Sequence, residues 1–340
     1  MSDDKATVVQ KEDAHKAPRK RGCAGHCLKF WWAYLLALVV IVVIVVPVIL
    51  LVAVPKIAQS KIDEAELTLE SIVVSNTQTT NMTMAIESTI RTDGKVHANI
   101  DPFVGDMYLE DLEGHTSFAR IEFPATTADA LQTVSVKQFL NIDNMEAFTT
   151  FNTWLLANES FRVTVKGDTQ VTVKGIARKY PVTFKKTVTL QGLQYFKGTT
   201  VHNATINLNP TQNFNATANI PNRSVVTFEL GNATFHNYLA GEEVGTVLLT
   251  NVILRPGNDN NYPMFATVAQ GPILKALGQK PYCENGGILP FQLRGKSVVN
   301  NGQPLPYFAD ALASGNQTLD IDIGGTLKKD TTIVVPCSAA

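Results

Sequence analysis

The chain has 340 residues, a formal net charge of −1 and 17% charged residues, below the ~25% usual for soluble domains. A near-neutral chain without a clustered basic face is unsuited to binding nucleic-acid phosphates, so nucleic acid is excluded as a partner. The length allows two domains of ordinary size and an additional segment.

An uncharged apolar segment occupies residues 30–54, with the sequence FWWAYLLALVVIVVIVVPVILLVAV. As a helix it would be about 37 Å long, enough to cross a hydrocarbon core of ~30 Å with some tilt. Its many Leu, Ile and Val residues outweigh the single Pro47. A cleaved signal peptide is the alternative, but its apolar core usually has only ~7–15 residues. The length favours an uncleaved signal anchor that follows a disordered cytosolic tail at residues 1–29.

The charges that flank this segment predict its orientation. Two cationic residues lie close downstream, whereas five lie within fifteen residues upstream: Lys16, Arg19, Lys20, Arg21 and Lys29. The positive-inside rule therefore keeps the N-terminus in the cytosol and places the rest of the chain in a lumen or outside the cell. Seven N-x-S/T sequons lie on that side and are candidate N-glycosylation sites: Asn81, Asn158, Asn203, Asn215, Asn222, Asn232 and Asn316.

The four cysteines form two pairs in the sequence. Cys23 and Cys27 lie next to the apolar segment on the predicted cytosolic side, where they are either palmitoylated or unmodified thiols. Cys283 and Cys337 lie on the other side, where an oxidising compartment favours a disulfide over two buried free thiols. On the chain-entropy model this bridge would stabilise the fold by about 4 kcal/mol.

Alternation of apolar and polar residues dominates after residue 62. It is clearest at 67–74, 161–167, 169–175 and 181–190, with further runs at 202–208, 224–230, 244–254, 288–294 and 331–335. Many short strands between Gly, Asn and Pro breakers predict a mainly β fold of antiparallel sandwiches. Short helices are expected at 144–157, where Asp143 and Glu146 form a capping pair, and at 271–279 and 305–314.

A weak internal repeat predicts how the strands are divided. Residues 106–124 align with residues 236–256, so that Tyr108 meets Tyr238. We therefore expect two β-sandwich domains, at 60–195 and 196–340, which are joined near residues 194–200.

The sequence contains no recognisable catalytic machinery. Residues 294–297 resemble the end of a phosphate-binding loop, but Pro290 stands where that motif requires glycine. No motif of a serine hydrolase, zinc protease or dithiol oxidoreductase follows the apolar segment. The histidines are scattered singly along this part of the chain: His97, His115, His202 and His236. Asp320 and Asp322 would share one face of a strand, which is better explained as a solvated face than as a cation site. We expect no enzyme activity, no metal and no cofactor.

One apolar stripe has two interpretations. Phe148, Phe151, Trp154 and Leu155 share a face of the helix expected at 144–157. The stripe is either the inner face of a lid over a lipid groove or the contact surface of an ordinary core helix.

Two sequence elements carry a family resemblance. Asn219-Ile220-Pro221-Asn222, followed by alternating strands and then by Leu254-Arg255-Pro256-Gly257-Asn258, resembles the late-embryogenesis-abundant type 2 (water-stress, WHy-like) domain. Residues 20–337 as a whole resemble a fungal family of single-pass membrane proteins of largely unknown function, through the segments 147–156, 162–167, 281–283 and 297–304. That family is similar to the autophagy-termination protein of the vacuolar membrane.

The resemblance implies two Ig/fibronectin-like sandwiches and a place in the fungal vacuole membrane. Relatives with such sandwiches are suggested to hold lipid in an apolar groove. We therefore expect a non-enzymatic type II membrane protein whose lumenal domains bind lipid or partner proteins. A structural or adhesive glycosylated ectodomain at the cell surface or in another endomembrane is the alternative.

Overall fold

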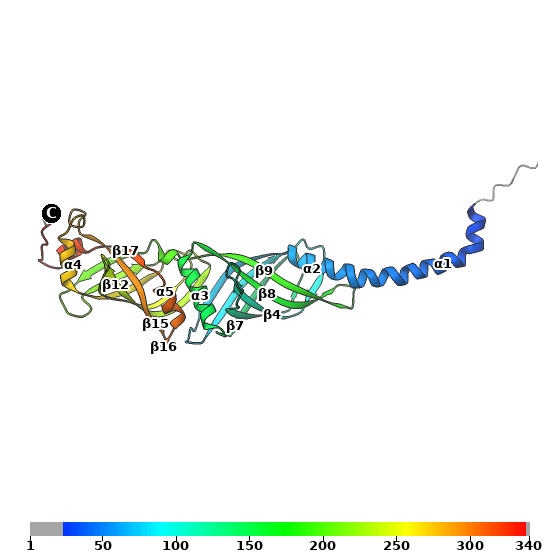
Figure 1. Ribbon diagram of the computed structural model, residues 1–340, viewed down its shortest axis with the longest axis horizontal. Coiled ribbons are helices and arrows are strands. Elements are labelled where there is room, and N and C mark those ends of the chain that lie inside the picture. The colour runs from blue at the N-terminus through cyan, green and yellow to red at the C-terminus, as the bar shows by residue number, and fades with distance from the viewer. Residues whose placement is uncertain (1–22, 338–340) are drawn as a thin grey trace, which may run out of the picture. The chain divides into compact units, whose positions relative to one another are not determined.

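The computed structural model describes residues 23–337, with side chains from residue 31 onward. It divides into two units at Lys56/Ile57, and Figure 1 labels some of their elements. The helices are α1 (Cys23–Val48), the π-helical η1 (Ile49–Ala53), α2 (Val54–Glu64), α3 (Met145–Ala157), the 3-10 turn η2 (Gln194–Phe196), α4 (Gln270–Leu277), α5 (Pro306–Ala313) and α6 (Ile323–Asp330).

The predicted apolar helix is confirmed. Among the described residues, one helix is long and apolar enough to cross a membrane, with a mean hydropathy of 3.7 in its best window. Pro47 lies near the end of α1 and the π-helical η1 follows it at once, as expected where a proline removes a backbone donor. Its apolar side chains are exposed on all sides, which suits a helix surrounded by lipid. Residues 1–22 of the predicted tail, and the side chains of Cys23 and Cys27, lie outside the described residues.

The predicted β-rich fold is also confirmed. The strands are β1 (Glu66–Ser75), β2 (Asn81–Arg91), β3 (Ala98–Ile100), β4 (Phe103–Leu109), β5 (Ala119–Phe123), β6 (Thr126–Thr127), β7 (Leu131–Asn141), β8 (Ser160–Val173), β9 (Lys179–Gln191), β10 (Thr200–Ile206), β11 (Phe214–Asn219), β12 (Val226–Leu239), β13 (Glu242–Leu254), β14 (Asn261–Val268), β15 (Ile288–Asn300), β16 (Gln303–Pro304) and β17 (Gln317–Asp322). They form two open sheets, one ordered β10-β11-β14-β13-β12-β1-β2-β7 with β15, β16 and β17 attached, and one ordered β5-β4-β8-β3-β6 with β9 attached.

The larger sheet crosses the domain boundary that the sequence predicts. β1 pairs in parallel with β12, and Ile72 lies opposite Val226. Beyond Gly231, β12 pairs instead with β15. Gly231 has a positive φ of 75°, and a Cβ there would lie 2.6 Å from the carbonyl oxygen of Val299, so only glycine fits this change of partner. Residues 57–340 form one compact unit, and the boundary at 195/196 stays a prediction.

Three local expectations were wrong. Gly167 does not separate two strands, because β8 runs unbroken through it; its missing Cβ lets the carbonyl of Val104 approach closely. Residues 331–335 form no strand, although Ile333 packs against the core; an extended segment that buries one side produces the same alternation. The N-cap of α3 is Asn144, whose side chain accepts a hydrogen bond from the Ala147 N–H at 2.9 Å, rather than Asp143.

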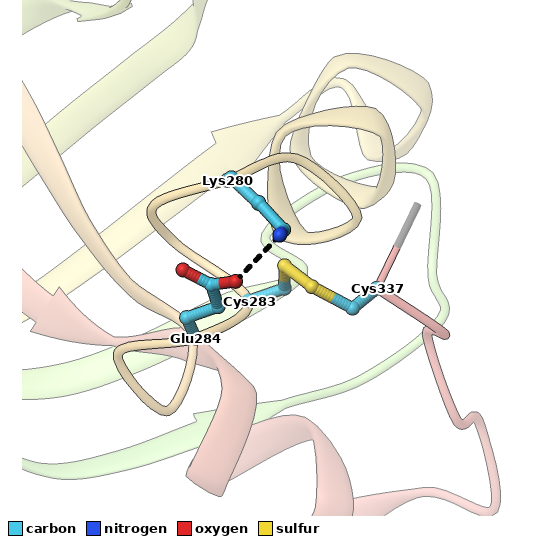
Figure 2. The surroundings of a disulfide bond; sticks show 4 residues. All are labelled: Lys280, Cys283, Glu284 and Cys337. Atoms are coloured by element: carbon cyan, nitrogen blue, oxygen red, sulfur yellow. Dashed lines mark ion pairs between the residues drawn. A yellow bond between two sulfur atoms is a disulfide. The ribbon is translucent and has the colours of Figure 1, made fainter. Parts of the chain in front are cut away.

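The predicted disulfide is present. Cys283, in the loop between α4 and β15, is bonded to Cys337, and their Cα atoms are 5.4 Å apart. Figure 2 shows this bond beside the ion pair between Lys280 and Glu284, whose atoms are 2.9 Å apart. The bond ties the C-terminal segment after α6 to the loop after α4.

Cys283 and Cys337 should resist alkylation in the native full-length chain until a reductant is added. Reduction should lower the free energy of unfolding by about 2–4 kcal/mol, since it releases a long closed loop. Urea titration with and without reductant measures this change. A chain with both cysteines replaced by serine is the control, and its stability should not respond to reductant. Labelling of both thiols in the native protein without reductant would contradict the bond.

Candidate functional site

The helix for which the sequence left two interpretations, a lipid lid or a core helix, is packed into the core. Phe148 and Leu155 are only 3% and 1% exposed, whereas Phe151 and Trp154 are half-buried. The Phe151 ring stacks on Phe118 with centroids 4.3 Å apart. None of the four residues of the apolar stripe lines either of the two cavities described below.

α3 also makes core contacts with α5. α3 packs against α5, and the rings of Phe148 and the buried Tyr307 form a T-shaped pair with centroids 5.0 Å apart. Buried Asn152 donates a hydrogen bond to the carbonyl of Phe148 within the helix, at 2.8 Å. Two of the four stripe residues are buried, and Phe148 and Phe151 pack on aromatic rings of other elements. These contacts favour the interpretation of α3 as core.

An apolar cavity lies between the two sheets, next to α2. This cavity has a volume of about 290 Å³, close to the ~300 Å³ lower end for ligand pockets. Its walls come from α2, the end of β2, β3, β8 and β9, and are mostly aliphatic: Ala58, Ile62, Ala65, Ile90, Val96, Ala98, Ile100, Ala128, Val171, Val173 and Phe184. We call it the α2 cavity.

α2 is fixed to the sheet edge by a side-chain amide. The Gln59 Nε2 donates to the Thr183 carbonyl at 2.8 Å, and the Thr183 N–H donates back to Gln59 Oε1 at 2.9 Å. The amide thus pairs with β9 as a neighbouring strand would. It holds α2 against the sheet, while Ala58 and Ile62 on the same helix are buried in the core.

A buried lysine binds the C-terminal end of α2. The Lys186 Nζ donates to the carbonyls of Asp63 and Ala65, at 2.8 and 2.5 Å. These carbonyls lie at the helix C-terminus, where backbone acceptors lack partners within the helix and a positive charge is favourable. Burial lowers the pKa of Lys186, as desolvation of an ammonium group requires.

Charged groups form the rim of the α2 cavity. The Lys61 Nζ lies 2.6 Å from a Glu64 carboxylate oxygen and 3.0 Å from one of Asp93. The hydrogen bonds from Lys61 lower the pKa of both carboxyls. A carboxylate whose pKa is lowered by folding stabilises the fold above its ordinary pKa, and that contribution is lost only below about pH 4. The rim therefore keeps its ion pairs at neutral and mildly acidic pH.

The α2 cavity is close to the apolar helix along the chain. Ala58, in its wall, is four residues after Val54, where the apolar run ends. Four residues span at most about 14 Å when fully extended and about 6 Å in a helix. Whatever the orientation of the two units, the cavity wall begins within that distance of the end of the apolar segment.

The remaining candidates for chemistry do not converge. In residues 23–337 no group of three or more His, Cys, Asp or Glu side chains could hold a metal ion. His115 stacks on Tyr108, and His236 lies 2.7 Å from Glu243. Asp322 caps α6 by accepting the Gly325 N–H at 2.7 Å. The segment 294–297 lies inside β15 and forms no loop, and His97 and His202 join no such group.

The seven sequons differ in exposure. Asn203, Asn232 and Asn316 are exposed, whereas Asn81, Asn158 and Asn215 are half-buried. Asn222 is only 2% exposed, and its Nδ2 donates to the carbonyls of Val226 and Leu254. A glycan linked to the same nitrogen would displace these bonds, so we expect Asn222 to be unmodified in the folded protein.

The two elements of the family resemblance meet in space. Asn222 and Gly257 exchange both backbone hydrogen bonds, each 2.8 Å long. Asn260 closes the second turn, since its side chain pairs with both the N–H and the carbonyl of Arg255. Asn222 and Asn260 thus have a structural role in holding these two turns together.

Sequence reasoning missed the α2 cavity and the residues that attach α2. Gln59 and Lys186 sit in polar positions of a helix and a strand, where nothing local separates them from solvated side chains. The only available signal was the continuation of apolar residues, Ala58 and Ile62, beyond the charged Lys56.

Comparison with known proteins gives one family match. Residues 116–237 match the family described as "Protein of unknown function (DUF3712)", which covers a little over a third of the chain. No curated protein matches.

Similar solved structures are distant. An adhesin from Mobiluncus mulieris is 9% identical, with 68% of this chain and 80% of that chain covered and a TM-score of 0.20. The CupB6 tip adhesin from Pseudomonas aeruginosa is 9% identical, with 76% and 98% covered and a TM-score of 0.20. A family 2 glycosyl hydrolase from Bacteroides cellulosilyticus is 8% identical over 41% of this chain, with a TM-score of 0.20; the match spans only 15% of the hydrolase. Scores this low carry no argument about function.

Replacing Phe148 with Ala should separate a core helix from a lid. If α3 is core, the substitution should lower the free energy of unfolding by about 3–5 kcal/mol, measured by urea titration, and leave lipid binding of the folded protein unchanged. Phe139→Ala is the control. Phe139 is 63% exposed, so this substitution should change the free energy of unfolding little. A small stability change combined with lost lipid binding would restore the lid interpretation.

Proposed function

We propose that this chain is a non-enzymatic, single-pass membrane protein whose folded region binds the acyl chain of a membrane lipid in the α2 cavity. One observation carries the proposal. An aliphatic cavity of about 290 Å³ has Ala58 in its wall, four residues after the end of the apolar segment 30–54 and within a helix long enough to span a bilayer. A lipid could therefore pass from the bilayer surface into the cavity over a short distance.

The lining suits an acyl chain. Each methylene that moves from water into such a space contributes about 0.8 kcal/mol, and the walls offer few polar atoms that would need a partner. A polar or charged ligand would lose hydration there without compensation. An extended hydrocarbon chain is thus the best match to the interior.

The rim indicates the kind of headgroup. Lys61 and Arg91 lie there with three carboxylates, Glu64, Glu66 and Asp93, and Lys61 is already paired with two of them. A rim with a slight negative excess does not attract an anionic headgroup. We therefore propose a neutral or zwitterionic lipid.

The membrane topology belongs to the same proposal. The flanking charges support a cytosolic N-terminus, with Cys23 and Cys27 as palmitoylation candidates on that side, and a lumenal unit 57–340. The family resemblance supports the fungal vacuole membrane. A glycosylated adhesive ectodomain at the cell surface shares this topology, but it gives the α2 cavity no role. Protein partners would bind the lumenal unit from the same compartment.

Glycan mapping tests the topology. In the full-length protein from its own cells, glycosidase treatment in ¹⁸O water should label exposed sequons such as Asn232 and leave Asn222 unlabelled. Asn232→Gln should remove one glycan from the apparent mass, whereas Asn222→Gln should remove none from the folded protein. Absence of label at all seven sequons, together with protease access to residues 57–340 in sealed cytosol-out vesicles, would overturn the orientation.

Photo-cross-linking tests lipid binding. The full chain is placed in nanodiscs of phosphatidylcholine with a diazirine in the acyl chain, and cross-linked peptides are mapped by mass spectrometry. We expect cross-links to β2 and β8 near Ile90 and Val173. Val173→Trp should reduce their yield at least ~5-fold, since the indole fills the cavity.

A matched substitution controls this experiment. Val104→Trp introduces the same side chain on another strand, where Val104 is 52% exposed and lies outside the α2 cavity. It should leave the cross-link yield unchanged. Cross-links confined to residues 30–54 in the unmodified protein would refute lipid binding by the folded unit.

A further inference from the structure

A second cavity lies among β10, β11, β12, β14 and β15 and the helices α4 and α6. It has a volume of about 70 Å³ and shares no lining residue with the α2 cavity. Its walls are mainly apolar, with Phe214, Met264, Ile273, Leu277, Phe291 and Leu327 among them. Ile333, on the segment that the disulfide ties down, also reaches its lining.

One polar side chain in this cavity is unpaired. Asn237 on β12 is 4% exposed, and its Oδ1 has no hydrogen-bond partner within the described part of the chain. Its position lies between the buried Phe235 and Leu239 on the inner face of the strand. A buried amide oxygen without a partner destabilises a fold and calls for an explanation.

The other polar residues of the lining differ from Asn237. Asn213 exchanges hydrogen bonds with the backbone of Val268, at 2.8 and 3.0 Å. Asn207 pairs with the backbone of Gln212 and Asn209, and Gln270 is exposed. Among the described residues that line this cavity, Asn237 is thus the buried polar side chain left without a partner for its oxygen.

We propose that this cavity binds a small neutral alcohol whose hydroxyl pairs with the Asn237 amide. No charged side chain lines the cavity, so a carboxylate or ammonium group would be desolvated without compensation. A hydroxyl both donates and accepts, and so it pairs with the amide in either of its two orientations. The volume is about half of the ~150 Å³ cavity that holds benzene, which limits the enclosed apolar part to about four carbon atoms.

Two isosteric probes test the proposal. 1-Butanol and n-pentane differ in one terminal group, and methyl NMR of the full chain in nanodiscs follows the resonances of Met264 and Ile273. Both probes should shift these methyls. Asn237→Leu should weaken 1-butanol binding about 5-fold, the loss expected for one hydrogen bond, and leave n-pentane binding unchanged or tighter.

Controls keep each outcome decisive. Asn232→Leu, on the same strand but exposed, should change neither affinity. If Asn237→Leu does not fold, the side-chain amide resonance of Asn237 in the unmodified protein must shift with 1-butanol and not with n-pentane. Equal effects of Asn237→Leu on both probes, or no methyl shift with either, would overturn the proposal. This result is independent of lipid in the α2 cavity.

Discussion

The parallel pairing of β1 with β12 is the constraint on which the rest of residues 57–340 depends. β1 starts two residues after α2 ends, and it pairs with β2 on one side and with β12 on the other. A slip of one residue would turn Ile72 and Val74 from the core to the outer face. Such a slip would also displace α2, which precedes β1 directly. The pairing of β1 with β12 therefore determines both the larger sheet and the position of the α2 wall of the cavity.

Glutamine side chains protect the open sheet edges. Gln59 occupies the edge of β9 from α2, and Gln138 of β7 bonds to the Glu122 N–H and the Arg120 carbonyl of β5, each at 2.9 Å. An unpaired edge is a template for strand addition by another chain. The Gln59 and Gln138 amides bond to the free backbone N–H and C=O groups of β9 and β5, so these groups are not available to another chain. α2 therefore protects an edge and forms a cavity wall at once.

Local features of this fold are readable in the sequence, and long-range ones are not. The apolar helix, the alternation of strands such as β9, helices α3 to α5 and the Cys283–Cys337 bond follow from composition, period and compartment. The β1–β12 pairing joins residues some 150 positions apart and leaves no local signal. Gly167 was misjudged because a glycine that admits a neighbouring backbone looks like one that breaks a strand. Asn237 is one of many asparagines, and its burial without a hydrogen-bond partner for its side-chain oxygen has no local signal in the sequence.

The buried sequon at Asn222 has a consequence for biosynthesis. Its amide is protected by the carbonyl of Leu254, which lies 32 residues later in the chain. At ~5–20 residues per second, about 2–6 s of synthesis separate the two. In the lumenal topology proposed above, an oligosaccharide transferase meets Asn222 unprotected during that interval, and a glycan on its Nδ2 displaces the hydrogen bonds to the Val226 and Leu254 carbonyls. In that topology translation and glycan transfer compete at Asn222, and slower translation of this segment would divert more chains from folding.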